Sequence, residues 1–369
     1  MGFLKRDFKV IVAGQDVSSR FYPRLKSVSV DRSAGQSTDS ASLTLADPNG
    51  TTFLPSDRAP IEIHLGGQWA FTGFVTEVTC SIGKDSGREI EISADSVDHG
   101  AKPKEPALRH KDKGTLSAVA QEFGSKAGLS VQVLGSIAGI ERDYWLQQNE
   151  SFLSWGQRIA REVGGTFKVI GSRAFLAARN EGLSASGQPL TPIIAAWGDN
   201  LLSASVTPIV SRPKFSQVKL SYFDIAKAEK VEVPVDTGLT DVNAILRSTL
   251  SVANESQAKQ RGQAHGKESD REKGQGDVTI IGDARAEPEA LCILRGVRPG
   301  VDGAYRIDTV QHKADKSSGF VTTLQLRQPQ QGAGSDSRGS KTASSGSSLT
   351  APNNLALDTT AADPNSNIA

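Results

Sequence analysis

Histidines are the residues of this 369-residue chain whose chemistry would be easiest to recognise, and there are five of them. His99 and His110 stand eleven positions apart, with Asp98 and Asp112 beside them. Imidazole and carboxylate groups are zinc ligands, but a zinc site needs them at coordinating spacing. The segment reads instead as a polar linker. We therefore predict no metal site and no cofactor.

His312 stands in a strand-like run and would need a nucleophile or carboxylate within hydrogen-bond reach to act as a base. Asp308 is on the same face of the predicted strand, about 13 Å away at a rise of about 3.3 Å per residue. We interpret His312 as a scaffold residue on the wetter face of its strand. His265, in a highly charged segment, is interpreted as solvated, and His64 lies on the polar face of its strand.

Hydrolysis of the cell wall is the sharpest enzymatic alternative, and it would require paired carboxylates, a Cys/His pair or a metal. The 41 acidic residues are compatible with a carboxylate pair, but no recognisable signature surrounds any of them. Neither a G-x-S-x-G elbow nor a phosphate-binding loop is present. We predict no catalytic residues and no enzyme activity.

Charge gives no general attraction to nucleic acid or anionic lipid, because 42 basic and 41 acidic residues leave a net charge of +1. The segment 102–113, KPKEPALRHKDK, is locally basic but has no aromatic residues on which bases could stack. We predict a solvated linker there, with a lumen or partner contact as the alternative, and no specific nucleic-acid binding. No apolar run approaches the roughly 18 residues of a membrane span, so we expect no membrane anchor and a chain kept soluble in a cytoplasm.

Alternation with period two dominates the first hundred residues and predicts half-buried strands. Apolar residues alternate with polar ones in 41–45, 61–65 and 90–94, and turn sequences such as DPNG separate the runs. Such strands are typical of an antiparallel barrel or sandwich. Cys80 and Cys292 lie in apolar strand-like runs, so we expect both to be small buried residues.

The period changes to that of helices in the next segment, which we expect to form a small α+β domain over residues 112–180. Thr115 and Ser151 are suitable N-caps for two amphipathic helices, and Gly164 suits a left-handed helix end. Strands TFKVI and AFLAA complete this domain. The overall prediction is therefore a mainly β protein with an α+β insertion.

Strand patterns return over residues 190–329, which we predict as a second β domain. A charged helix near 254–277 interrupts it, and we expect this helix to be solvated and weakened by Gly262 and Gly266. From residue 330 to 369 the chain is rich in Gly, Ser, Thr, Ala and Asn, which is typical of a flexible low-complexity tail.

Trp69, Phe71 and Phe74, in QWAFTGFVTEV, are candidates for a subunit interface, where aromatic residues are enriched. Trp69 and Phe71 would share one face of a regular strand. Core burial is therefore the simpler interpretation, and an interface is the alternative.

Three stretches together resemble the phage late control protein D family, the baseplate hub proteins of contractile tails and of related injection machines such as type VI secretion spikes. They are KGTLSAVAQEFGSKAGLSVQV, DYWLQQNESFLSWGQRIAREVGGTFKV and GVDGAYRIDTVQHKADKSSGFVTTLQLR, and the charged helix precedes the third. The resemblance covers about residues 1–330 and is weakest in the first hundred.

This resemblance implies two β-barrel domains like tail-tube subunits on one chain, at about 1–100 and 190–329. Three copies would present six barrels, so that a six-fold tube could meet a three-fold spike. The implied partners are two further copies of the chain, a spike protein below, a tail tube or tube-initiator protein above, a tape measure protein and other baseplate proteins. The implied location is the virion tail, assembled in the bacterial host cytoplasm. Type VI relatives carry a fused spike domain, whereas only the tail follows Pro329 here, so we expect the spike to be a separate polypeptide.

Overall fold

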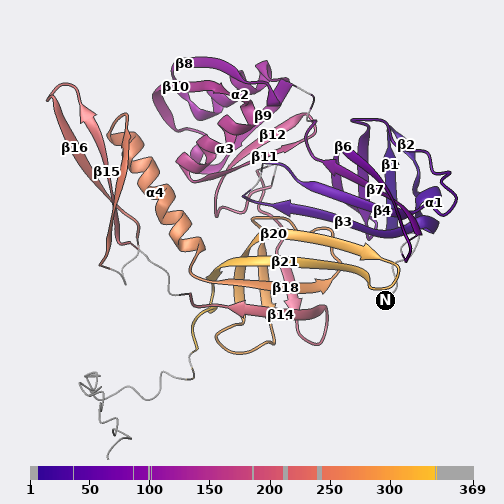
Figure 1. Ribbon diagram of the computed structural model, residues 1–369. Helices are drawn as coiled ribbons and strands as arrows, with labels where there is room; N and C mark the ends of the chain where they lie inside the picture. The colour runs from indigo at the N-terminus through magenta and orange to yellow at the C-terminus, as the bar shows by residue number, and fades with distance from the viewer. Residues whose placement is uncertain are drawn as a thin grey trace, which may run out of the picture. The chain divides into compact units, whose positions relative to one another are not determined.

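Strands make up most of the chain in the computed structural model, as predicted (Figure 1). The structure describes residues 7–35, 37–85, 87–98, 100, 102–184, 187–210, 215–238, 243–336 and 338. Met1–Ser335 forms one compact unit and Asp336–Ala369 a second. Most of the tail predicted for 330–369 therefore lies outside the described residues, although 330–336 are described.

The first hundred residues form the strands that the period-two pattern predicted. In 41–45, 61–65 and 90–94 the apolar residues are buried and the polar ones between them are at least partly exposed. The elements of this region are β1 (Phe8–Val12), β2 (Gln15–Asp16), α1 (Ser18–Phe21), β3 (Leu25–Ser33), β4 (Ser40–Ala46), β5 (Pro60–Leu65), β6 (Gln68–Gly83) and β7 (Gly87–Asp95).

The second predicted β region contributes to the same sheet. Its strands are β13 (Ile193–Ala196), β14 (Leu201–Thr207), β18 (Gln275–Ile281), β19 (Leu291–Arg295), β20 (Gly303–Asp315) and β21 (Gly319–Gln330). β20 pairs antiparallel with β3, from Thr309 opposite Ser33 to Asp315 opposite Ser27. The resulting order is β14-β18-β21-β20-β3-β4-β7-β6-β5-β1-β2, with β13 and β19 attached through β20. Within the described residues no pairing joins β14 to β2, so this order is an open path and not a closed barrel.

A bulge in β20 changes which residues face the core. The pairing of β20 with β21 shifts register between Ile307 and Thr309. Before the shift the odd-numbered Tyr305 and Ile307 are buried, and after it the even-numbered Val310 and His312 are buried. His312 is 0% exposed, so the prediction of a wetter face for it is wrong. Regular alternation does not foresee a bulge, because one additional residue moves every later side chain to the other face.

The α+β insertion contains the two predicted helices with the predicted caps. Thr115 Oγ1 accepts a hydrogen bond from the Ala118 backbone N–H, Ser151 Oγ accepts one from that of Ser154, and Gly164 is left-handed with φ +67°. The elements are η3 (Lys102–Lys104), β8 (Ala107–Thr115), α2 (Leu116–Lys126), β9 (Ser130–Leu134), η4 (Gly135–Ile137), β10 (Glu141–Glu150), α3 (Phe152–Val163), β11 (Gly165–Ile170) and β12 (Arg173–Ala178).

The predicted linker at 102–113 is wrong for its second half, because β8 is a strand that pairs with β10. β8 has no buried residue, so its sequence stays polar and lacks the alternation that marks other strands. Backbone pairing with β10 forms the strand without an apolar signal. The insertion core is instead built by large aromatic side chains of the helices and of β10 and β11, namely Phe123, Trp145, Phe152, Trp155 and Phe167.

The charged helix α4 (Glu255–Arg271) packs on a small sheet of β15 (Gln217–Asp224), β16 (Glu229–Asp236) and β17 (Ile245–Val252), seen beside it in Figure 1. Ala258, Gly262 and Gly266 lie on one buried stripe. A Cβ at Gly262 would come within 2.4 Å of the Val235 Cβ. The prediction of a solvated helix weakened by these glycines is therefore wrong for this face, because the glycines allow the helix to approach β16 closely.

The two cysteines differ in their surroundings. Cys292 is buried, as predicted, and burial raises the pKa of its thiol to about 12. Cys80 is exposed, contrary to the prediction. β6 is 16 residues long, and most of its second half extends beyond the core, so its alternation there no longer indicates burial.

We predict that Gly262→Leu destabilises the packing of α4 on β16. Forcing a side chain into this contact should lower the free energy of unfolding by about 1–3 kcal/mol, the usual cost of overpacking. Gln263→Leu, at the adjacent exposed position of the same helix, is the matched control. Calorimetric unfolding measures both, and equal stabilities of the two variants would contradict the close contact.

We also predict that His312 makes stability depend on pH. Burial, together with repulsion from Arg32, lowers its pKa from 6.5 to about 3. As the pH falls below about 6.5, a histidine in the unfolded chain takes up a proton while folded His312 stays neutral, so stability present above pH 6.5 is lost towards pH 3. Below about pH 6.5, His312→Asn should reduce the slope of unfolding free energy against pH, by a difference that approaches about 1.4 kcal/mol per pH unit near pH 5. Denaturant titrations at each pH would refute this if His312→Asn and the exposed-site control His265→Asn kept the same slope.

Candidate functional site

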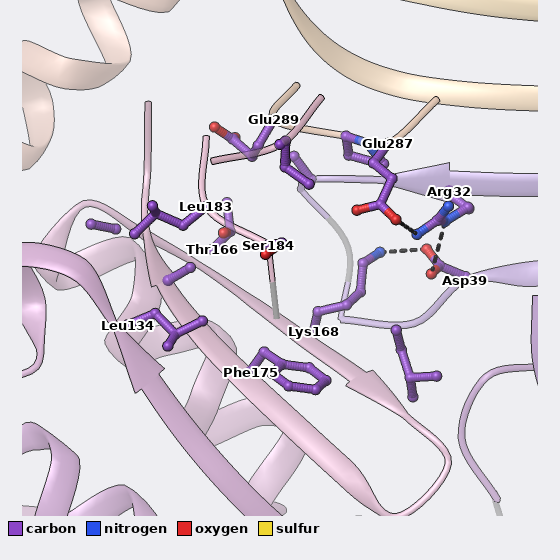
Figure 2. A pocket seen from close by; sticks show the side chains of 16 residues that line it. Arg32, Asp39, Leu134, Thr166, Lys168, Phe175, Leu183, Ser184, Glu287 and Glu289 are labelled. Carbon is purple, nitrogen blue, oxygen red and sulfur yellow. Dashed lines mark hydrogen bonds and ion pairs between the residues drawn. The ribbon is translucent and has the colours of Figure 1, made fainter. Parts of the chain in front are cut away.

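A buried charged cluster lies where the insertion meets the first β region (Figure 2). Lys168 Nζ on β11 lies 2.5 Å from Asp39 Oδ1, and Lys168 also donates a hydrogen bond to the Ser33 carbonyl at 2.6 Å. Arg32 on β3 lies 3.7 Å from Asp39 and 3.7 Å from Glu287. Burial lowers the pKa of Lys168, although Asp39 acts in the opposite direction. The cluster therefore connects β3, β11 and the segment before β19.

These charged residues form one wall of a pocket with about 120 Å³ of accessible space. Leu134, Phe175 and Leu183 lie away from these charges in Figure 2, and Ile170 and Leu190 are further apolar residues of the lining. Ligand pockets usually have about 300–1,000 Å³, so this one has room only for a few water molecules or one small group. Arg32 Nη1 has no hydrogen-bond partner among the described residues. We interpret the pocket as part of a structural junction.

A second buried cluster connects α4 to β20 and to the end of the insertion. Arg271 lies 2.5 Å from Glu289 and 2.5 Å from Asp308. Burial alone would lower the pKa of Arg271, but the two carboxylates outweigh burial and raise it. Arg306 donates to the Glu289 carbonyl at 2.7 Å and to the Asn180 carbonyl at 2.9 Å. This network holds three distant segments together with paired charges.

The histidines provide no catalytic arrangement in the described part of the chain. His312 Nδ1 lies 3.0 Å from Thr322 Oγ1, His64 pairs with Glu62, and His110 stacks on Tyr144. No group of three or more potential metal ligands occurs among the described residues, and His99 lies outside them. Within the same residues, no helix has the length and apolar character needed to cross a membrane.

The structure separates the three aromatic residues predicted as a possible interface. Phe71 is 1% exposed and belongs to the core, whereas Trp69 and Phe74 are half-buried. A register shift opposite Ile63 and His64 leaves Trp69 and Phe71 on different faces, so the expectation of a shared face is wrong. Trp69 Nε1 donates to Thr72, and the Arg32 guanidinium lies 5.1 Å from its ring centre. An interface role for Trp69 and Phe74 stays a prediction.

An apolar surface around Asn200 was missed by the sequence analysis. Asn200 Nδ2 donates to the Ile194 carbonyl, its own carbonyl accepts from the Ile281 N–H, and Trp197 forms a bridge with Leu201. The exposed apolar residues of this surface, called the Trp197 surface below, are Ile194, Trp197, Leu202 and Ile281. Trp197 is 66% exposed. Sequence alone could not separate these residues from core residues, because an apolar run looks the same in both places.

We predict that Arg271→Ala destabilises the protein by about 3–5 kcal/mol, because it leaves Glu289 buried without its charged partner. Arg247→Ala, which breaks an exposed pair with Glu232, is the matched control and should have a much smaller effect. Urea unfolding followed by tryptophan fluorescence measures both. A comparable loss in the two variants would show that the buried network does not hold the segments together.

Comparison with known proteins gives relatives in phage tails, although no family model matches the chain. A probable baseplate hub protein of Escherichia phage P2 is 24% identical over 213 residues, which cover 53% of this chain and 51% of the relative. The chain thus spans about half the length of the curated relative that it matches.

Solved structures share the fold over most of the chain. A 43 kDa tail protein of prophage MuSo2 from Shewanella oneidensis superposes with a TM-score of 0.63 at 17% identity, covering 86% of this chain and 97% of that one. The E. coli c3393 protein, a type VI secretion component similar to the T4 tail proteins gp27 and gp5, superposes with a TM-score of 0.53 at 11% identity, covering 85% of this chain and 76% of that one. The expected resemblance is confirmed: this chain is similar in sequence to a phage baseplate hub protein and has the fold of phage tail proteins.

Proposed function

We propose that this protein is a structural baseplate hub of a contractile phage tail or tail-like injection particle. The observation that carries the proposal is the sequence match to the P2 baseplate hub protein, supported by a tail-protein fold over 86% of the chain. The relatives and structural neighbours named above are baseplate, tail and secretion-system components. A non-enzymatic role agrees with the paired state of the buried charges in both clusters.

The proposed mechanism is geometric. Each chain supplies two tube-like β regions, at about 1–100 and 190–329, and three chains supply six. Six such regions would match a six-fold tube above, while the three-fold assembly would hold a spike below. The pairing of β3 with β20 supports this mechanism, because backbone hydrogen bonds keep the two regions of one chain at a constant relation to each other.

The proposed partners are two further copies of the chain, the spike, and a tail tube or tube-initiator protein, with a tape measure protein and other baseplate proteins as further neighbours. The proposed location is the virion tail, after assembly in the host cytoplasm. The Trp197 surface supports contact between copies, since exposed tryptophan is enriched at the energetic centres of interfaces. Trp69 and Phe74 remain further candidates for such a contact.

We predict that the purified chain has the mass of a trimer by light scattering, either alone or when co-expressed with the spike protein. A stable monomer that does not respond to the spike would contradict the hub proposal. Clearing of purified peptidoglycan by the protein would instead favour the alternative, a tail-tip peptidoglycan hydrolase.

Trp197→Ser should shift the mass towards the monomer, because it removes a large exposed apolar side chain. Leu108→Ser, an equally exposed apolar position on β8, is the control and should leave the mass unchanged.

A further inference from the structure

A groove of about 750 Å³ lies between α3 and α4 and extends to the turn after β3. This volume is within the usual range of about 300–1,000 Å³ for binding pockets. α3 and α4 are in contact here, and a Cβ at Gly164 would lie 3.2 Å from the Ala264 Cα. The charged and polar side chains that line the groove are Gln157, Arg158, Arg161, Glu162, Thr166, Arg179, Arg261, His265 and Glu268. None of them belongs to either buried cluster described above.

Glu162, in the floor of this groove, is shared by three arginines. Its carboxylate lies 2.8 Å from Arg142, 2.9 Å from Arg261 and 3.3 Å from Arg158. Burial alone would raise the pKa of Glu162, but the hydrogen bond and the attraction of these arginines outweigh burial and lower it. One carboxylate cannot neutralise three guanidinium groups, and within the described part of the chain only Arg158 has a second acidic partner, Glu150.

Arg158 and Arg261 line the groove, as do two more arginines, whereas Arg142 is buried and does not line it. Arg179 pairs with Glu268, whereas Arg161 is exposed and has no acidic group within 4.0 Å in the described part of the chain. Its Nε donates only to the backbone carbonyl of Gln157, at 3.4 Å. Four arginines and two carboxylates line the groove, which leaves an excess of two positive charges in a chain whose total is +1.

The composition of the groove favours carboxylates over nucleic acid as the bound anion. Guanidinium groups match carboxylates and phosphates alike through two parallel hydrogen bonds, so the distinction between these anions rests on base stacking. Single-stranded nucleic acid is usually held by exposed aromatic side chains on which bases stack. The aromatic residue that lines this groove, Phe167, is buried in the insertion core and offers no such surface.

We propose that this groove binds an acidic segment of a partner protein, whose carboxylates pair with Arg161, Arg158 and Arg261. The proposal rests on the charges and geometry of the groove and does not depend on the hub function. A trimer could form without it, and acidic binding could occur in a monomer. The two proposals therefore fail separately.

The test uses fluorescence anisotropy with the full chain and a fluorescein-labelled deca-glutamate peptide as the probe. We expect saturable binding at about 20 mM salt that weakens steeply towards about 300 mM, because exposed charges are screened. Arg161→Glu should weaken binding by about tenfold or more, since it removes one charge-assisted contact and adds repulsion. Arg20→Glu, the same charge change at an exposed position on α1, is the matched control and should bind as the unchanged protein does.

Three results would overturn the proposal. One is the absence of binding to deca-glutamate at low salt. Another is equal weakening by Arg161→Glu and Arg20→Glu, which would indicate attraction to the whole surface rather than to the groove. The third is tighter binding of a ten-nucleotide oligo-dT than of deca-glutamate, lost in Arg161→Glu, which would assign the groove to nucleic acid. Circular dichroism of each variant confirms that the measured protein is folded.

Discussion

The antiparallel pairing of β3 with β20 is the contact on which the rest of the structure depends. It joins residues 27–33 to residues 309–315, so that strands from the two ends of the sequence become neighbours in one sheet. Backbone hydrogen bonds in such a ladder allow little freedom between the partners. The insertion and the α4 unit are both attached close to this seam, because their charged anchors contact residues of β3 and β20 or residues beside them.

Ion pairs attach the insertion and α4 to the sheet. Lys168 reaches Asp39 from the insertion, and Arg271 reaches Glu289 and Asp308 from the helix α4. Buried ion pairs add little net stability compared with apolar packing, but they are costly to break, and they tolerate few alternative arrangements. Such anchors suit a protein whose parts must keep a defined relation to one another. They also explain why many titratable groups are buried in the described part of the chain.

Glycine performs a second positioning role in α4. Gly262 and Gly266 lie against Val235 and Thr237, which brings the helix backbone close to β16. An adjacent, charged side of the same helix then faces α3, where Arg261 shares Glu162 with arginines from the insertion. Close packing on one side and a positively charged groove on the other are thus consequences of a single helix placement. This helix thus separates a packed face from the groove for which we propose a partner.

The sequence by itself determined the strand-rich character, the two helices with caps at Thr115 and Ser151, and the resemblance to baseplate hub proteins. These features depend on local periodicity, on capping chemistry and on the order of motifs, which a chain carries without its partners. Tertiary structure alone decided that His312 is buried, that β8 is a strand, and that Trp69 and Phe71 lie on different faces of β6. Bulges shift every following side chain to the other face, and an exposed strand needs no apolar pattern. The groove between α3 and α4 could not be predicted from the sequence either. Its arginines are scattered from Arg158 to Arg261 and become neighbours only when the two helices pack.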